Sequence, residues 1–299
     1  MRPIISVENM RQSDLATING GVPSLTLMKN AAIGIMKSTE WRGRISIVVG
    51  SGNNGGDGFA LACELAEISI PCEIFSLSDK LSPDSEYYKN EALKRKIPIT
   101  KLESCDINIF SDSDIIVDCI FGTGFHGEVK GLSKDVIDAV NNSQAYTISA
   151  DINSGINGDT GLATTAVISD LTVSIGQLKN GFFMNNAPNY IGKLINASIG
   201  IEPEHEENYL LSKNEFVRKY IEIKSNEIFI KKLPNMPSGI QTLDDIKKIS
   251  SDYDAVLYIK TLYTSFLVDS KAAWIRTPQN LIEVDSDASI FSSIQNTRI

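Results

Sequence analysis

The sequence has few of the residues that build disulfide frameworks or zinc sites. Only four of its 299 residues are cysteines, two are histidines, and no two cysteines form a C-x-x-C pair. Such a composition argues against a protein held together by disulfides and against a zinc site made of His and Cys ligands. We therefore expect the cysteines to be reduced and mostly buried, as in a cytoplasmic protein.

Basic charge is also scarce. The chain carries 28 Lys and Arg residues against 37 Asp and Glu residues, for a net charge of −9. A protein that binds nucleic acid or an anionic membrane over a broad area needs a basic face, so we expect neither as a partner. The sequence also lacks an apolar run long enough to span a membrane, and the start of the chain lacks the apolar core of a signal peptide. These absences favour a cytoplasmic protein whose ligand is held by local donors.

What the sequence does contain is an alternation of apolar strands and amphipathic helices. The pattern predicts strands over 45–49, 72–77, 115–121, 147–152, 171–175 and 193–199, and helices over 6–18, 23–36, 82–95 and 133–140, with another helix ending at 67. Strands that are apolar along their whole length and alternate with helices are typical of a parallel sheet covered on both faces. We predict an α/β fold with a doubly wound, mostly parallel sheet.

A change in composition indicates a boundary in the last third of the chain. After Ile201 the sequence becomes charged, over residues 202–207. We expect residues 1–207 to form the main domain and residues 208–299 to form a small C-terminal α+β appendage. Alternating apolar residues at 256, 258, 266 and 268 predict a small sheet there. No glycine follows Gly239, so the appendage has no glycine-rich loop for a nucleotide phosphate, and we expect it to be dispensable for catalysis.

A glycine-rich loop follows the first predicted strand. Residues 50–58 read Gly-Ser-Gly-Asn-Asn-Gly-Gly-Asp-Gly, and Gly50, Gly52 and Gly55 have the G-x-G-x-x-G spacing. Such glycines let backbone N–H groups approach an anion at the start of a helix. A simple turn needs one or two glycines, without the three polar side chains that stand between them here. We interpret this loop as a ligand site.

Two further polar clusters stand at the ends of predicted strands. Asp118 precedes Gly-Thr-Gly-Phe-His-Gly-Glu at 122–128, and Asp151 opens Asp-Ile-Asn-Ser-Gly. The carboxyl ends of parallel strands meet at one edge, so we expect all three clusters to form one site. Asn54, Asp118 and Ser154 offer oxygen ligands that suit an alkali or alkaline-earth cation. Asp57 and Asp151 would remain as free carboxylates, one of which could transfer a proton.

These motifs, in this order, resemble the NAD(P)H-hydrate epimerases, which are built on the YjeF N-terminal domain. The resemblance rests on Gly-Asn-Asn-Gly-Gly-Asp-Gly, Val-Asp-Cys-Ile-Phe-Gly-Thr-Gly and Asp-Ile-Asn-Ser-Gly, followed by Asp-Thr-Gly at 159–161, and it covers about residues 1–205. It implies a Rossmann-like domain, usually a homodimer, that interconverts the R and S epimers of hydrated NADH and NADPH.

The same resemblance implies roles for individual residues. Asp151 would be the catalytic acid or base, and Asn54, Asp118 and Ser154 would bind a potassium ion. The NAD(P)HX substrate would be held by Asp151 together with residues of the two glycine-rich segments: Asn53, Asn54, Gly55, Gly56, Asp57, Gly122, Thr123, Gly124, Phe125, His126, Gly127 and Glu128.

The chain departs from the family pattern at three positions. Asn153 stands where proline is usual, and we expect this change to loosen the loop that carries Ser154. Lys29 replaces the usual Glu, and Ala32 replaces the usual Gly, in the second predicted helix. None of the three changes removes a ligand that the resemblance implies.

Other interpretations remain open. Some YjeF N-terminal domains serve as non-catalytic scaffold or nucleotide-binding modules, but retention of Asn54, Asp118, Asp151 and Ser154 favours catalysis. An ordinary nicotinamide dehydrogenase could use Asp79 to bind a ribose, but this reading leaves two of the polar clusters unexplained. The C-terminal region could be a degenerate remnant of the hydrate dehydratase domain found in bifunctional relatives.

Overall fold

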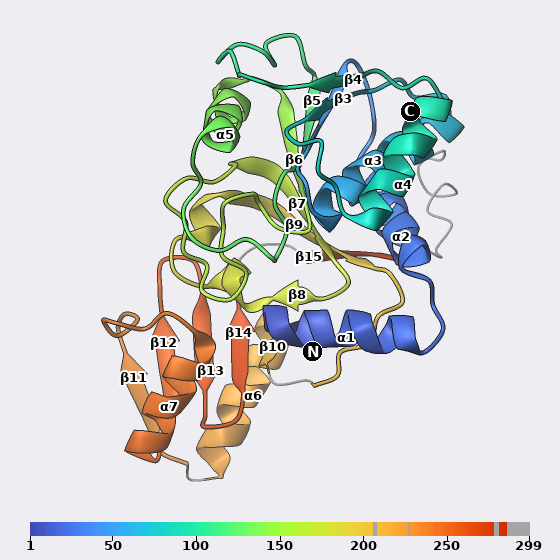
Figure 1. Ribbon diagram of the computed structural model, residues 1–299. Helices are drawn as coiled ribbons and strands as arrows, with labels where there is room; N and C mark the ends of the chain where they lie inside the picture. The colour runs from blue at the N-terminus through green and yellow to red at the C-terminus, as the bar shows by residue number, and fades with distance from the viewer. Residues whose placement is uncertain (206–207, 227, 278–280, 286–299) are drawn as a thin grey trace, which may run out of the picture.

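A large parallel sheet forms the centre of the molecule in the computed structural model, which describes residues 1–205, 208–226, 228–277 and 281–285 (Figure 1). Its eight described strands lie in the order β15-β9-β7-β6-β5-β2-β3-β4, and all their pairings are parallel. The strands span Ile45–Val49 (β2), Glu73–Ser76 (β3), Ile99–Lys101 (β4), Ile115–Cys119 (β5), Tyr146–Ala150 (β6), Ser169–Ile175 (β7), Ile191–Ser198 (β9) and Leu281–Asp285 (β15). This confirms the predicted α/β class and its parallel sheet.

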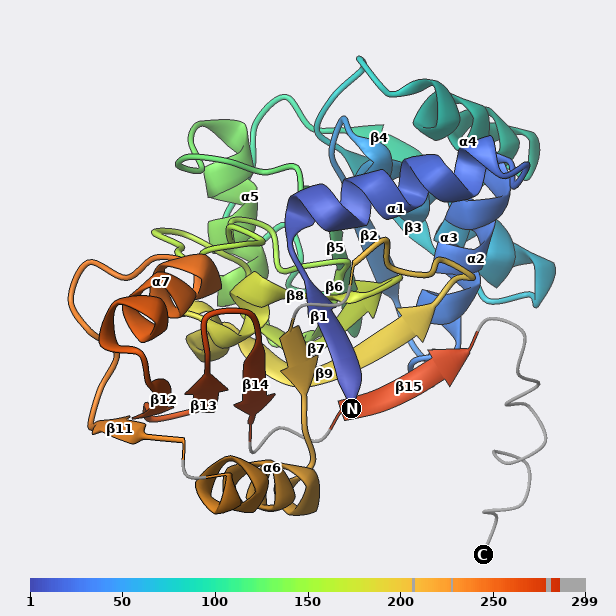
Figure 2. The same cartoon turned by 90° about the horizontal axis from the view of Figure 1, so that it is seen from below.

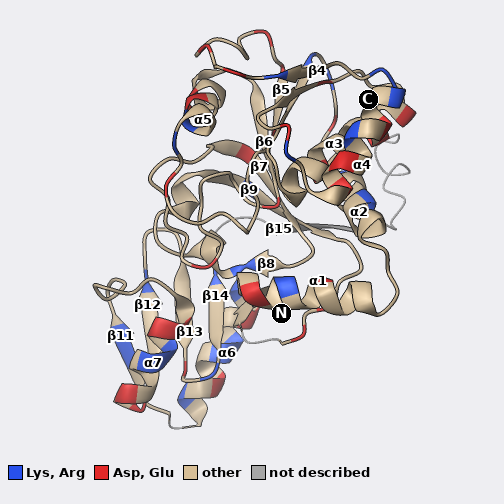
Figure 3. Cartoon of the chain, in the orientation of Figure 1, with Lys and Arg blue, Asp and Glu red and all other residues tan. Residues whose placement is uncertain are grey.

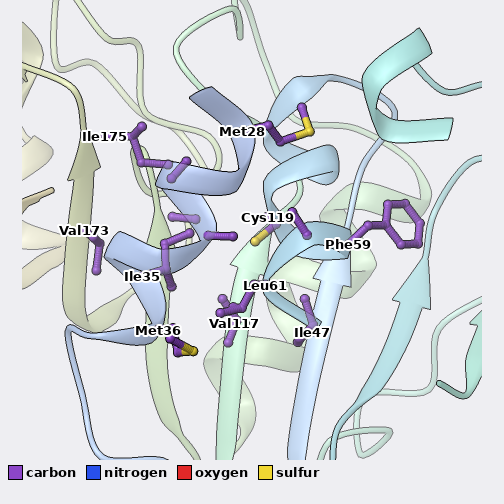
Figure 4. Packing of buried hydrophobic residues seen from close by; sticks show 14 of the residues in the cluster. Met28, Ile35, Met36, Ile47, Phe59, Leu61, Val117, Cys119, Val173 and Ile175 are labelled. Atoms are coloured by element: carbon purple, nitrogen blue, oxygen red, sulfur yellow. The ribbon is translucent and has the colours of Figure 1, made fainter. Parts of the chain in front are cut away.

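Helices cover both faces of this sheet. One face carries α2, α3 and α4 and the other carries α5, as Figure 1 shows. The helices span Val7–Asn19 (α1), Ser24–Met36 (α2), Asn53–Glu67 (α3), Pro83–Lys94 (α4) and Leu132–Asn142 (α5). Buried side chains of α2 and α3, including Ile35 and Leu61, meet Ile47 and Val117 of the central strands (Figure 4). The core therefore anchors the start of α3 directly above β2 and β5.

Most of the glycine-rich segment, from Asn53 on, is the first part of α3, and only residues 50–52 precede the helix; this corrects the prediction that the whole segment is a loop. The helix begins at Asn53, and Gly55 and Gly58 pack it against the strands below. A Cβ atom at Gly55 would come within 2.3 Å of the Gly50 oxygen, and one at Gly58 within 2.7 Å of Val49. Close packing of the helix on the end of β2 therefore explains these two glycines.

Residues from both ends of the chain form a second sheet. The described strands lie in the order β11-β12-β13-β14-β10-β1-β8. They span Arg2–Ile5 (β1), Leu178–Lys179 (β8), Asn208–Leu210 (β10), Ile230–Leu233 (β11), Val256–Lys260 (β12), Ser265–Val268 (β13) and Ala273–Arg276 (β14). Short 3₁₀ helices, Asn180–Phe183 (η1) and Ala187–Asn189 (η2), follow β8. The predicted C-terminal sheet thus exists, and it extends across the expected boundary at 207 to include β1 and β8.

Two helices cover the C-terminal part of this second sheet on opposite faces. Helix α6 (Lys213–Ser225) packs on Val256 and Leu267, whereas α7 (Leu243–Tyr253) packs on Leu257. The face beneath α7 also meets buried residues of the main sheet's connections, such as Phe182. The outward surfaces of α6 and α7 carry both signs of charge (Figure 3). Both faces of the small sheet are therefore buried within the chain.

Two further expectations concerned reduced, mostly buried cysteines and the lack of an apolar run long enough to span a membrane. All four cysteines are free; Cys63 and Cys119 are buried, and Cys72 and Cys105 are partly exposed. Among the described residues, no helix combines the length and the apolar character that a membrane crossing requires.

Candidate active site

A pocket of about 770 Å³ opens at the carboxyl ends of β2, β5 and β6. The chain order of the strands reverses between β2 and β5, and ligands of open α/β sheets bind at such a reversal. Helices α1 and α2 close the pocket from the side. The pocket lies where the three polar clusters were expected to converge.

The structure brings most of the predicted residues to this pocket. Gly127 and Glu128 are exposed beyond it, Gly55 and Gly56 are buried inside α3, and Asp118 and Ser154 are buried behind the wall. The pocket wall includes Asn53, Asn54, Asp57, Gly122, Thr123, Gly124, Phe125, His126 and Asp151.

Asp118 is fully buried and receives a complete set of hydrogen bonds. Its Oδ2 accepts from the Ser154 amide and the Ser149 hydroxyl, both at 2.9 Å. Its Oδ1 accepts from the Ser154 hydroxyl at 2.5 Å and the Ile120 amide at 3.2 Å. Burial raises the pKa of Asp118, and the hydrogen bonds from Ser154 oppose that rise. This carboxylate ties the end of β5 to the loop after β6.

Asn153 holds the same loop and does not loosen it, which corrects the expectation drawn from the missing proline. The side chain is fully buried, and its Nδ2 donates to Val167 O, Tyr190 O and Ser169 Oγ, each at 2.9 Å. Its Oδ1 accepts from Thr172 Oγ1 at 2.6 Å. These contacts fix Ser154 on its N-terminal side.

Asn54 has an unusual environment for a buried polar side chain. Both Oδ1 and Nδ2 are buried, and neither has a hydrogen-bond partner in the described part of the chain. An unsatisfied buried polar group costs about 1–3 kcal/mol, so such groups call for a ligand that is not part of the chain. Asn54 lies against Gly122, on the pocket wall. An unpartnered amide oxygen is one of the oxygen ligands that a hard cation takes.

Asp151 makes an ion pair with a lysine that is completely buried. Lys179 Nζ lies 2.5 Å from Asp151 Oδ1, and it also donates to Ile175 O at 2.7 Å and to Ser174 Oγ at 3.2 Å. All three ammonium protons are therefore used. Asp151 Oδ2 accepts from the Thr123 amide at 3.1 Å. The carboxylate is thus held between the two sheets and points into the pocket.

The backbone of Asp151 is also held in an uncommon conformation. Its φ is 64°, in the left-handed region that residues other than glycine rarely adopt. Its amide donates to Val173 O at 2.8 Å, which pins the residue just beyond β6. Backbone strain of this kind is characteristic of functional sites, where the surrounding structure maintains it.

Two more carboxylates face the same pocket and resist ionisation. Burial raises the pKa of Asp57 well above its usual range, and the negative charges of Asp151 and Asp14 add to the rise while Lys179 opposes it. Burial likewise raises the pKa of Asp14 to about 6; Lys179 opposes this rise and Asp151 adds to it. The pocket therefore combines Asp151, paired with a cation, with Asp57, whose strongly raised pKa favours the protonated form, and with Asp14, whose pKa is raised less. Such an arrangement supplies both a proton acceptor and a proton donor.

Comparison with known sequences gives the family. Residues 24–181, which run from α2 into η1, match the family described as YjeF-related protein N-terminus. The chain belongs to this family.

Curated relatives of this YjeF-type chain carry related names. It is 34% identical over 202 residues to an NAD(P)H-hydrate epimerase of Limosilactobacillus reuteri, with 65% of this chain and 94% of the relative covered. It is 32% identical over 218 residues to the bifunctional NAD(P)H-hydrate repair enzyme Nnr of Methanothermobacter thermautotrophicus, covering 69% of this chain and 41% of that protein. The crystal structure of yeast ynu0 shares the fold, with a TM-score of 0.54, 18% identity, and coverage of 63% of this chain and 84% of that one.

Sequence reasoning missed Asp14, which lines this YjeF-type pocket, and Lys179, which is buried behind the pocket wall and pairs with Asp151. Lys179 stands alone after an apolar strand, and nothing in its surroundings distinguishes it from a surface lysine. Asp14 belongs to the Met-Arg-x-x-Asp pattern in the first helix, but it was not expected to line the site. Lys179 belongs to β8 of the second sheet, and Asp14 belongs to α1, the helix that follows β1 of that sheet.

Proposed function

We propose that this chain is an NAD(P)H-hydrate epimerase, an isomerase that interconverts the R and S epimers of hydrated NADH or NADPH. The observation that carries the proposal is the Asp151–Lys179 ion pair, whose carboxylate lines the pocket while its lysine is buried behind the wall. Epimerisation, whether by ring opening or by loss and re-addition of water, requires a proton carrier beside the reacting carbon. The names of the curated relatives support the same conclusion.

Asp151 is the acid or base in this proposal, and its neighbours hold its carboxylate in place. The buried ammonium of Lys179 pairs with Oδ1 of Asp151. It leaves Oδ2, which accepts from the Thr123 amide, free of the ion pair. Asp57, whose pKa burial raises, is suited to return a proton from the other wall. The pocket's glycine-rich wall, from Gly122 to Gly124, leaves room for the nicotinamide end of the substrate.

A potassium ion is part of the proposal, with Asn54, Asp118 and Ser154 as its ligands. The unpartnered Oδ1 of Asn54 fits this role directly. The acceptor positions of Asp118 are taken by hydrogen bonds, so the Ser154 hydroxyl would turn its proton from Asp118 to Phe121 O, 3.2 Å away. A bound monovalent cation would offset the buried charge of Asp118 and steady the Asn54 side chain. The homodimer implied by the resemblance and the cytoplasmic location inferred from the composition stay predictions.

The decisive experiment follows an R/S mixture of NADHX by NMR or chromatography while a separate dehydratase removes only the S form. The wild-type chain should drain the R form as well. Asp151→Asn should slow this about 10²–10⁴-fold, the usual contribution of a general acid or base, while dinucleotide binding is retained. Asp138→Asn, on the exposed surface of α5, is the matched control and should leave the rate unchanged.

Each contrary outcome has a defined meaning. Activity of Asp151→Asn within a few-fold of wild type would transfer the proton-carrying role to Asp57. Binding of NADHX by the wild-type chain without epimerisation would instead favour the non-catalytic nucleotide-binding or scaffold module.

A further inference from the structure

Strand β1 lies in the interior of the second sheet, between one strand from the main fold and one from the C-terminal segment. It pairs in parallel with β8, with Ile4 opposite Leu178 and Ile5 opposite Lys179. On its other side it pairs antiparallel with β10, with Ile4 opposite Asn208. Figure 2 shows β1 alongside β10 before the chain enters α1. The lysine that holds Asp151 is therefore two strands away from the C-terminal segment.

A buried polar connection runs along this row of the sheet. Asn208 Nδ2 donates to Asn180 Oδ1 at 3.2 Å, so the Asn208 side chain spans β1 to reach the residue that directly follows Lys179. Asn208 Oδ1 accepts from the amide of Ala273 in β14 at 3.2 Å. Asn208 is 2% exposed and Ala273 is fully buried. The connection thus links the middle of the C-terminal sheet to Asn180, the residue next to the lysine that pairs with Asp151.

The chain that leads into β10 also anchors the helix that closes the pocket. Asn9 Nδ2 donates to His205 O at 2.7 Å, and the Glu204 amide donates to Ser13 Oγ at 3.0 Å. The donor Asn9 and the acceptor Ser13 belong to the same helix as Asp14, which lines the pocket. Residues 204, 205 and 208 therefore contact both α1 and the residue that follows β8.

We propose that Asn208 is a positioning residue of the active site, which acts through Asn180 to fix Lys179 and thereby Asp151. This inference rests on the proposed function, and it gives the segment after residue 207 a part in catalysis that the sequence did not suggest. The physical reason is that Lys179 has no spare donor: its three contacts, at 2.5, 2.7 and 3.2 Å, are all in use. A displacement of about 1 Å carries such contacts beyond hydrogen-bonding range and can cost on the order of 100-fold in rate.

The test uses the full chain and compares Asn208→Ala with Ser250→Ala. Ser250 is also buried in the C-terminal segment, where its hydroxyl donates to Ala255 O, but it has no link to Lys179. Asn208→Ala should lower kcat about ten- to 100-fold and change KM less than about twofold, because the contact orients a catalytic pair. Ser250→Ala should lower the melting temperature and leave kcat within about twofold. Asn180→Ala removes the same contact from the other end, and it replaces Asn208→Ala if that variant does not fold.

A double-mutant cycle separates positioning from general destabilisation. If Asn208 acts through Lys179, Asn208→Ala should have less than about a twofold effect on kcat in a Lys179→Met background. Equal losses in the two backgrounds, or equal kcat values for Asn208→Ala and Ser250→Ala, would overturn the inference.

A structural readout keeps this test independent of the proposed function. In a crystal structure of Asn208→Ala, the Lys179 Nζ–Asp151 Oδ1 contact should lengthen beyond 3.5 Å. A contact that stays at 2.5 Å would contradict the inference, whereas an inactive wild-type chain with a displaced Lys179 in the variant would contradict only the epimerase assignment.

Discussion

Replacing Asp14 with asparagine should stabilise the fold at neutral pH. The native structure raises the pKa of this carboxyl from 3.8 to about 6, mainly by burial. The folded chain therefore binds the Asp14 proton more tightly than the unfolded chain does. Stability from this group is fully present below about pH 4 and is lost as the pH rises through 6. At pH 7.5 the ionised Asp14 works against folding, and asparagine removes that charge.

The expected magnitude follows from the shift. Two pKa units at about 1.4 kcal/mol each give roughly 3 kcal/mol, which we reduce to about 2 kcal/mol because Asp14 lines an open pocket and keeps some contact with water. Unfolding entropy of about 2 cal/mol/K per residue amounts to about 0.6 kcal/mol/K for 299 residues. The melting temperature of Asp14→Asn should then rise by about 3 °C at pH 7.5.

Thermal unfolding followed by calorimetry at two pH values tests this reasoning. At pH 5, midway between the unfolded and folded pKa values, the gain should fall to about half, roughly 1 kcal/mol. Asp138→Asn, an exposed replacement on α5, should change stability by no more than about 0.5 kcal/mol at either pH. A melting temperature of Asp14→Asn that is unchanged at pH 7.5, or a gain that is as large at pH 5, would refute the electrostatic account.

Three other outcomes are expected. Lys179→Met should destabilise the chain by about 3 kcal/mol in denaturant titrations, because it leaves a half-buried carboxylate uncompensated, and adding Asp151→Asn should restore part of the loss; additive losses would contradict the pairing. Exchange of potassium for sodium should lower epimerisation, and Asn54→Leu should remove this ion dependence, whereas equal rates in both salts would argue against the ion site. Gly155→Ala should cost more than about 2 kcal/mol, since φ is 104° and the added Cβ would lie 2.1 Å from a backbone oxygen, but Gly124→Ala, in open space, should be nearly neutral in the same melts.

The sequence predicted the parallel sheet because its strands are local and carry their own apolar pattern. Residues 45–49 coincide with β2, and the helix expected over 82–95 is α4, which begins after a Ser82 cap that accepts from the Ser85 amide. The convergence of the polar strand ends follows from parallel topology alone, and for that reason it was also predictable.

The parts that were missed depend on contacts between distant segments. Strand β1 has four residues, one of them proline, and carries no recognisable strand pattern of its own. Its partners are even shorter: β8 has two residues and β10 has three, and they begin only at Leu178 and Asn208. Lys179 owes its burial and its partner entirely to this arrangement, so no local pattern could have assigned it to the site.

The central place of β1 has a consequence for how the chain reaches its native state. During synthesis, residues 2–5 leave the ribosome long before residues 178–179 and 208–210 exist to pair with them. Most strands of the parallel sheet pair over shorter sequence separations. The pairings of β1, in the second sheet, join Ile4 to Leu178 and to Asn208 and so close loops of about 170 and about 200 residues, and such high contact order slows folding. The apolar pair Ile4 and Ile5, fully buried in the end, stays exposed meanwhile. The slow step in refolding should therefore be the capture of β1, and the nascent chain is most vulnerable to aggregation or chaperone binding at this first strand.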